Sequence, residues 1–137
     1  MRTALIVFIF ITLANFTQAD EGCLVKDKNR MYDVSIIHLI TNPDFYDGAF
    51  VRIKGVASTD IDRQRVYLSK ESFENFIRSN SVGIKFHSDI FKKHPDILPI
   101  IHGTYQIIEG TFYQTSSTGG YVANVCRISA YYSGVAK

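Results

Sequence analysis

Four histidines in this chain could in principle hold a metal ion, because imidazole is the commonest protein ligand for transition metals. His87, His94 and His102 lie seven and eight residues apart, a spacing that would align them on one face of a continuous helix. Pro95 and Pro99 would interrupt that helix, and His87 falls in an alternating stretch that favours a strand. No His-Glu-x-x-His motif occurs. We therefore expect surface histidines, no metal site and no cofactor.

Hydrolytic chemistry would need an activated nucleophile or a pair of carboxylates. The chain has no Gly-x-Ser-x-Gly elbow of the kind that exposes a nucleophilic serine. Asp60 and Asp62 could form an acid–base pair, but both fall in a polar loop, where carboxylates are usually solvated. Glu109 stands alone in a predicted strand, and no second acid accompanies it there. The expectation is a non-enzymatic protein, and a small hydrolase is the alternative.

Positive and aromatic residues follow one another along the middle of the chain, a pattern that barrels binding oligonucleotides use to hold phosphates and stack bases. The residues concerned are Arg52, Lys54, Arg63, Arg65 and Lys85, with Tyr67 and Phe86 as stacking platforms. The formal net charge is only +2, whereas a dedicated nucleic-acid binder carries a strongly basic face. An oligonucleotide-binding module is therefore an alternative, and a solvated strand face is the simpler interpretation.

Tyrosines are concentrated toward the carboxyl end of the chain. Tyr131 and Tyr132 are consecutive, and neighbouring residues of a regular strand point to opposite faces, so at least one is outward. Exposed tyrosines are enriched at protein interfaces. This favours contact with a protein or an envelope glycan. Packing of the outward ring beneath the helix expected at residues 34–41 is the alternative.

The amino-terminal residues follow the pattern of an export signal. Arg2 precedes an apolar run of ten residues at 4–13 (ALIVFIFITL), and small residues stand at Thr17 and Ala19. That run is too short for a helix that crosses a bilayer, which needs roughly 20 residues. We predict cleavage after Ala19, which separates a signal at residues 1–19 from one domain at residues 20–137. The product would be periplasmic or secreted, and the loss of Arg2 lowers its formal net charge from +2 to +1.

Two cysteines in an exported chain are most simply a disulfide, because the extracytoplasmic environment is oxidising. Cys23 and Cys126 lie near opposite ends of the predicted domain. A bridge between them would close a loop of about 100 residues, for which the chain-entropy model gives about 4.7 kcal/mol. No Cys-x-x-Cys pair or nearby histidine favours a metal-binding or reactive thiol instead.

Five strands and three short helices are expected in the domain. Strands are predicted at residues 50–56, 65–68, 81–87, 104–115 and 120–132, from alternation and bordering turn residues. In the first strand Val51 and Ile53 should face inward, opposite Arg52 and Lys54. Helices are expected at 34–41, capped by Asp33 and followed by a turn at 45–48, at 69–78 with Phe73, Phe76 and Ile77 inward, and at 89–102, broken by prolines.

The order of these elements is that of the OB-fold, a mainly β, five-stranded Greek-key barrel. The broken helix at 89–102 takes the place between strands 3 and 4, where this fold carries its helix. Gly55 and Gly110 fall inside strands that must coil sharply to close a small barrel.

Four segments, taken in order, resemble small exported bacterial OB-fold-like proteins of uncharacterised function. They are residues 39–43 (LITNP), 46–55 (YDGAFVRIKG), 67–71 (YLSKE) and 108–112 (IEGTF). Residues 79–85 (SNSVGIK) depart from that pattern. The resemblance implies the barrel and supplies no catalytic residues. The sequence as a whole predicts an exported OB-fold binding protein that contacts a protein or envelope-glycan partner and is inhibitor-like.

Overall fold

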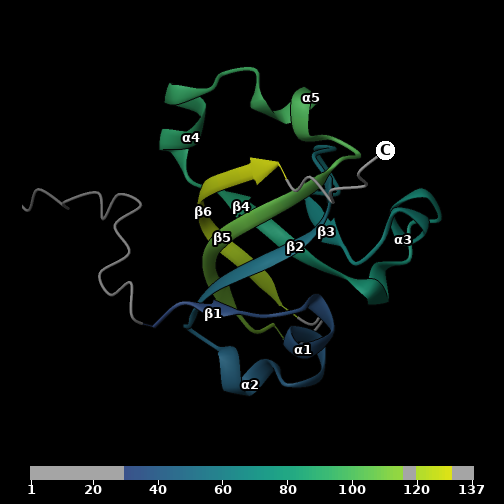
Figure 1. Ribbon diagram of the computed structural model, residues 1–137, viewed down its shortest axis with the longest axis vertical. Helices are drawn as coiled ribbons and strands as arrows, with labels where there is room; N and C mark the ends of the chain where they lie inside the picture. Colours follow the sequence, from purple (N-terminus) through teal and green to yellow (C-terminus); the bar gives the residue numbers. More distant parts are fainter. Residues whose placement is uncertain (1–29, 116–119, 131–137) are drawn as a thin grey trace, which may run out of the picture.

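The computed structural model describes residues 30–115 and 120–130, and the chain is drawn in Figure 1. The predicted signal, Cys23, Tyr131 and Tyr132 lie outside the described residues. The strand that carries Cys126 is described, but the side chain of this cysteine is not. The disulfide and the roles of the two tyrosines therefore stay predictions.

Strands and short helices alternate along the described chain. In order they are β1 (Tyr32–Asp33), α1 (Ile36–Thr41), α2 (Pro43–Tyr46), β2 (Phe50–Ser58), β3 (Arg65–Tyr67), α3 (Lys70–Glu74), the 3-10 turn η2 (Arg78–Asn80), β4 (Ser81–Phe86), α4 (Ser88–Lys93), α5 (Ile97–Ile101), β5 (Tyr105–Tyr113) and β6 (Tyr121–Ala130).

The strands β2 to β6 close into a barrel. Their order is β2-β3-β4-β6-β5, and β5 pairs in turn with β2. The β4–β6 pair is parallel, whereas the other pairs within the barrel are antiparallel. This closed, mainly β barrel with α4 and α5 inserted between β4 and β5 confirms the predicted OB-fold-like class. The short strand β1 was not predicted and pairs parallel with β2 outside the barrel.

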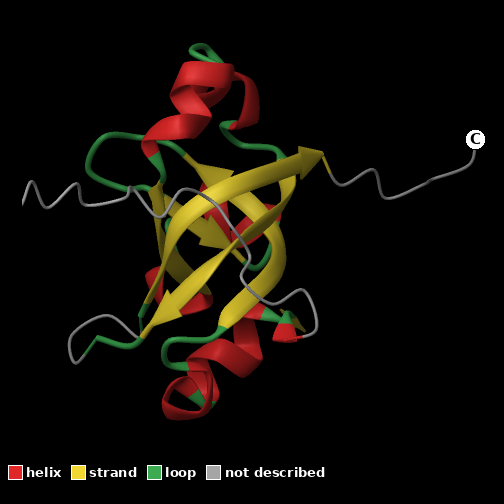
Figure 2. Cartoon of the chain, turned by 90° about the vertical axis from the view of Figure 1, so that its left-hand side faces the viewer, coloured by secondary structure: helices red, strands yellow, loops and turns green. Residues whose placement is uncertain are grey.

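The helices lie mostly at the two ends of the barrel. Figure 1 and Figure 2 show α4 and α5 at one end and α1 and α2 at the other. The predicted break in the helical insertion is confirmed at Pro95, because α4 ends before it and α5 begins two residues after it. The break expected at Pro99 is wrong, because Pro99 lies in the first turn of α5, where a missing N–H costs no helical hydrogen bond. Helix α3 lies beside β3, where its Phe73 packs edge-on against Tyr67.

Alternation along β2 decides which side chains form the core. Val51 and Ile53 are fully buried inside the barrel, and Arg52 and Lys54 point outward, as predicted. A Cβ atom on Gly55 would collide with the Tyr67 carbonyl oxygen of the neighbouring strand. Only glycine allows the two strands to approach this closely, which is the coiling that barrel closure requires.

Three local predictions near the helices were wrong. Helix α1 begins at Ile36, and its cap is the Ser35 hydroxyl, which accepts a hydrogen bond from the His38 N–H (3.2 Å), not Asp33. The expected turn at 45–48 is preceded by a further helical turn, α2, because Pro43 suits the first position of a helix. Phe76 and Ile77 are not inward, since α3 ends at Glu74 before it reaches them.

Candidate functional site

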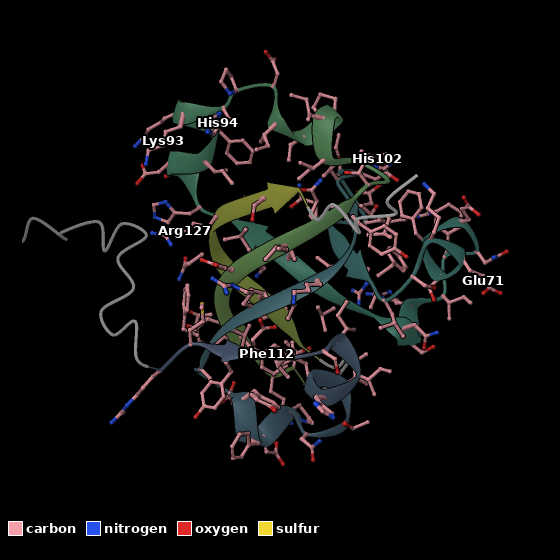
Figure 3. The ribbon with its side chains drawn as sticks, viewed as in Figure 1. Glu71, Lys93, His94, His102, Phe112 and Arg127 are labelled. Atoms are coloured by element: carbon pink, nitrogen blue, oxygen red, sulfur yellow. The ribbon has the colours of Figure 1, made fainter. Side chains whose placement is uncertain are left out.

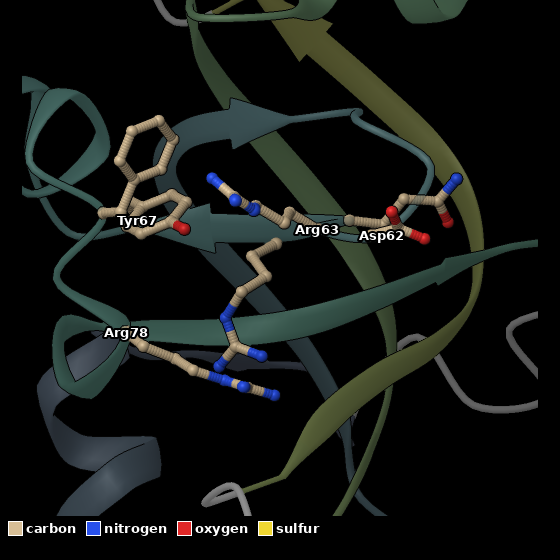
Figure 4. Close-up of a pocket in the computed structure, with 7 residues that line it drawn as sticks. Asp62, Arg63, Tyr67 and Arg78 are labelled. Atoms are coloured by element: carbon tan, nitrogen blue, oxygen red, sulfur yellow. The ribbon is translucent and has the colours of Figure 1, made fainter.

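A groove on the outer side of β3 is lined by three arginines. It encloses about 430 Å³. We name it the arginine pocket, and its lining residues are Asp62, Arg63, Gln64, Arg65, Tyr67, Phe76 and Arg78. Three segments supply them: the loop before β3, the strand β3 itself, and the chain between α3 and β4 (Figure 4). The site therefore depends on the pairing of β3 with β4, which brings the third segment beside the other two.

Arg65 forms the buried part of the pocket. It alternates with the core residue Val66, so it points away from the barrel interior, yet only 8% of its surface is exposed. Its Nε donates to the Ser81 Oγ (2.7 Å) and its Nη2 donates to the Ser81 carbonyl oxygen (3.1 Å). The Ser81 hydroxyl in turn donates to the Arg78 carbonyl oxygen (2.8 Å). Ser81 thus holds both the side chain of Arg65 and the backbone of Arg78 in place.

Among the described residues, the positive charge of the pocket is balanced only in part. Three guanidinium groups line it, against the single carboxylate of Asp62. Among residues 30–115 and 120–130, no carboxylate forms an ion pair with Arg63, Arg65 or Arg78. Burial lowers the pKa of the Arg65 guanidinium, and the neighbouring Arg78 charge lowers this pKa further. The group nevertheless remains protonated, since an arginine in a protein does not lose its proton.

Aromatic rings complete the pocket. The Arg63 guanidinium lies over the Phe76 ring, 4.7 Å from its centroid, in a cation–π contact. Phe76 is 54% exposed and adopts a φ of 52°, a left-handed conformation that is costly for a bulky side chain. Tyr67 belongs to the wall, because its ring packs edge-on against Phe73 and only 2% of the residue is exposed.

The predicted cation track does not stay together in three dimensions. Arg63, Arg65 and Tyr67 meet in the arginine pocket (Figure 4). Lys85 lies farther along β4 on the same outer face, with its Nζ 4.3 Å from the centroid of the Tyr121 ring. Phe86 packs against Phe91 of α4 and borders the core instead of offering a free face.

Arg52 and Lys54 lie on another side of the barrel, in ion pairs. Arg52 contacts the Glu109 Oε1 through Nε (2.8 Å) and Nη2 (2.7 Å), across the β2–β5 pair. The Arg127 Nη1 lies 3.8 Å from the other oxygen of this carboxylate, across β5–β6. We call these three residues the Glu109 cluster. Lys54 contacts Asp33 of β1 at 3.7 Å. Both predicted cations are thus separated from the arginine pocket.

A second groove of about 510 Å³ runs between α4, α5 and the outer side of β5 and β6. Lys93, the last residue of α4, and His94, which follows it, lie on the side of the molecule that carries Arg127 (Figure 3). Glu109 and Asp89 also line it, each of them already in an ion pair. A hydrogen bond from Lys92 lowers the pKa of the Asp89 carboxyl. The charges of this groove are thus largely balanced within the protein.

The histidines serve separate elements. The His87 Nδ1 caps α4 by accepting a hydrogen bond from the Asp89 N–H (3.2 Å). The His102 Nδ1 accepts one from the Thr59 N–H (3.2 Å) and thereby fixes the loop after β2. Within the part of the chain that the structure describes, no three metal-ligating side chains converge.

Phe76, Arg78 and Ser81 were not singled out from the sequence. Phe76 was assigned to the core because a longer helix was expected there, and Arg78 was placed at the end of that helix. The available signal was position: Phe76 and Arg78 precede a strand that pairs antiparallel with β3, which places them beside the Tyr67 end of β3.

Comparison with known proteins does not assign the chain to a family. No known protein family matches the chain, and no curated protein shows a significantly similar sequence. Among the described residues, no helix combines the length and the apolar composition that a membrane crossing requires.

Proposed function

We propose that this chain is an exported, non-enzymatic OB-fold-like binding protein that contacts an acidic protein partner through the outer face of β3 and β4. The observation that carries the proposal is the convergence of three guanidinium groups in one aromatic-walled groove. No carboxylate of the described residues forms an ion pair with any of them. Arginine and aromatic residues dominate the binding energy of protein interfaces when they cluster in this way.

The compactness of the pocket favours a protein over an oligonucleotide. A single-stranded nucleic acid needs a positive groove that follows several phosphates and rings on which successive bases stack. Here Arg52 and Lys54 are held in ion pairs on another side of the barrel, and Tyr67 is buried. What remains is one local concentration of charge, which suits a single acidic anchor of a protein partner.

An acidic envelope glycan is a second candidate, and a different observation favours it. The Tyr113 and Tyr121 rings lie 5.7 Å apart and are tilted by 37°, with Lys85 over the second ring. Tyr113 is 37% exposed, so its ring is available for contact with a sugar. This surface lies on β4, β5 and β6, so its substitution separates the two candidates.

The experiment is capture of partners from an envelope extract of the host, with the purified chain as bait. We expect one protein to be retained and to be lost with the double variant Arg63→Ala/Arg78→Ala. Arg127→Ala is the matched control, because it removes an exposed arginine from another side of the barrel. Retention of a partner by the double variant would refute the arginine pocket as the contact. Loss of the protein with Tyr113→Ala alone would move the contact to the Tyr113 and Tyr121 surface, and capture of no protein would favour the glycan. A steep decrease of affinity with salt for a single-stranded oligonucleotide would favour the nucleic-acid alternative.

Export and the disulfide are parts of the same proposal and are supported by the sequence pattern. The mature protein is expected to begin at Asp20, which amino-terminal mass spectrometry of the exported fraction would test. Cys23 and Cys126 are expected to react with an alkylating reagent only after reduction. Detection of Met1 in the exported fraction would contradict the first expectation, and alkylation without reduction would contradict the second.

A further inference from the structure

We propose that the arginine pocket is a binding site for one phosphate monoester group, with Arg65 and Arg78 as its guanidinium donors and Phe76 as the contact for the organic part of the ester. This inference rests on the proposed function, since it names the chemistry that the binding face recognises.

The first argument is the charge count. The three guanidinium groups that line the pocket exceed its one carboxylate by two positive charges. A phosphate monoester carries about −1.5 to −2 at neutral pH, whereas a carboxylate or a phosphodiester carries only −1. A dianion therefore balances the pocket, and a monoanion leaves an excess of positive charge in it.

The second argument is the supply of fixed donors. A guanidinium has five N–H groups, and Arg65 uses its Nε and one Nη2 hydrogen on Ser81. Among the described residues, no other acceptor takes the remaining hydrogens of Arg65. No buried side-chain nitrogen of the described residues lacks a hydrogen-bond partner, so the Nη1 of Arg65, which has none among these residues, is accessible from the groove. Because Ser81 already holds the guanidinium, little side-chain entropy is lost when an oxyanion binds.

The third argument is the mutual repulsion of two of the guanidinium groups. Arg65 and Arg78 line the same groove, and each charge disfavours the other. A dianion between them converts this repulsion into two sets of charge-assisted hydrogen bonds, which are about twice as strong as neutral ones. Among the described residues, no carboxylate forms an ion pair with Arg65 or Arg78 and relieves this repulsion.

The fourth argument concerns the group that carries the phosphate. Phe76 lines the groove with more than half of its surface exposed and in a strained backbone conformation. Such strain persists where the surrounding structure requires it, and it is concentrated at binding sites. An exposed ring beside the guanidinium groups provides an apolar contact that inorganic phosphate cannot use. This favours an ester over the free ion.

Calorimetric titration of the whole mature protein with phenyl phosphate, inorganic phosphate and benzoate tests the inference. Phenyl phosphate is expected to bind at least tenfold more tightly than benzoate, and more tightly than inorganic phosphate. Its affinity should rise from pH 5 to pH 7, because the ester loses its second proton near pH 6 while the arginines stay charged. Equal binding of benzoate would overturn the phosphate assignment, and equal binding of inorganic phosphate would overturn the ester contact.

Variants locate the site. Arg78→Gln, at an exposed position, is expected to lower the affinity for phenyl phosphate at least tenfold while the protein stays folded. Phe76→Ala should abolish the advantage of phenyl phosphate over inorganic phosphate, and Arg127→Gln should change neither. Unchanged affinity in Arg78→Gln, or no binding of phenyl phosphate by the wild type, would overturn the inference.

The two proposals fail in distinguishable ways. If the wild type captures a partner that the Arg63→Ala/Arg78→Ala variant does not, but phenyl phosphate does not bind, the protein contact stands and the phosphate site does not. If phenyl phosphate binds as expected but the double variant still captures the partner, the site stands and the proposed contact face does not.

Discussion

Two groups of arginines lie on the outside of the same barrel and differ in how their charge is balanced. In the Glu109 cluster, Arg52 and Arg127 flank one carboxylate that is only 7% exposed, on three adjacent strands. In the arginine pocket, three guanidinium groups face one groove without an ion pair among the described residues. The comparison shows that an arginine on the outer face of a strand is not necessarily available to a ligand. A carboxylate on the neighbouring strand can form an ion pair with its guanidinium, as Glu109 does with Arg52.

The barrel on which both groups depend is the first point to test. Val51→Asp replaces a fully buried core side chain next to Arg52 with an unpaired charge. We expect loss of the folded state, because an unpaired buried carboxylate costs several kcal/mol. Arg52→Ala, one residue along the same strand but outward, should remain folded. Circular dichroism of both variants checks this, and a folded Val51→Asp protein would contradict the assigned face of β2.

The Glu109 cluster should be structural, and its disruption should reduce stability. Glu109→Gln leaves Arg52 without its carboxylate, and we expect the free energy of unfolding to decrease by about 2 kcal/mol. Arg127→Ala should have a smaller effect, since Arg127 is more exposed and its contact is longer. Urea denaturation measures both. Equal stability of Glu109→Gln and the wild type would remove the distinction between the two groups.

The arginine pocket should respond in the opposite direction. Arg78→Gln removes a charge that repels Arg65, so we expect the free energy of unfolding to stay unchanged or to increase by up to about 0.5 kcal/mol. The same variant is the one expected to lose affinity for phenyl phosphate. A decrease in stability comparable to that of Glu109→Gln, in the same urea experiment, would show that Arg78 is a structural residue.

The smallest effect is expected where paired charges are exposed. The hydrogen bond from Lys92 lowers the pKa of Asp89 in the folded protein. Its stabilisation is therefore complete above the pKa of this carboxyl in the unfolded chain, and it is lost as pH falls through the folded-state pKa. Asp89→Asn should slightly reduce the loss of thermal stability as pH falls in the acid range, and it should leave the stability at neutral pH almost unchanged. Thermal unfolding from pH 2 to pH 7 measures the difference, and a large neutral-pH loss would contradict it.

Much of the fold was predictable because alternation reports the two faces of a strand. The pattern of residues 50–56 placed Val51 and Ile53 inside and Arg52 and Lys54 outside, and the structure confirms this. The short helices were less predictable. Phe76 was expected inward because its spacing from Phe73 fits a helical face, but α3 ends two residues before it and the chain turns at a positive φ.

The candidate site was only partly predictable. Arg63, Arg65 and Tyr67 are close in sequence and share one strand and its preceding loop, so their proximity follows from local structure. Arg78 and Ser81 join them through the register of β3 with β4, which the sequence pattern does not specify. The separation of Arg52 from this group has the same kind of cause, since its partner Glu109 is 57 residues away.

By itself, the sequence determined the order of the five barrel strands, the alternation of faces along β2, the close approach of strands at Gly55 and the end of α4 before Pro95. These are local properties, set by the backbone geometry of each residue and its neighbours. Only the tertiary structure decided which arginines are neutralised and which remain open to a ligand. The physical reason is that ion pairing requires atoms to lie within a few ångströms across strands that are remote in the chain, and burial determines how strongly such a pair holds.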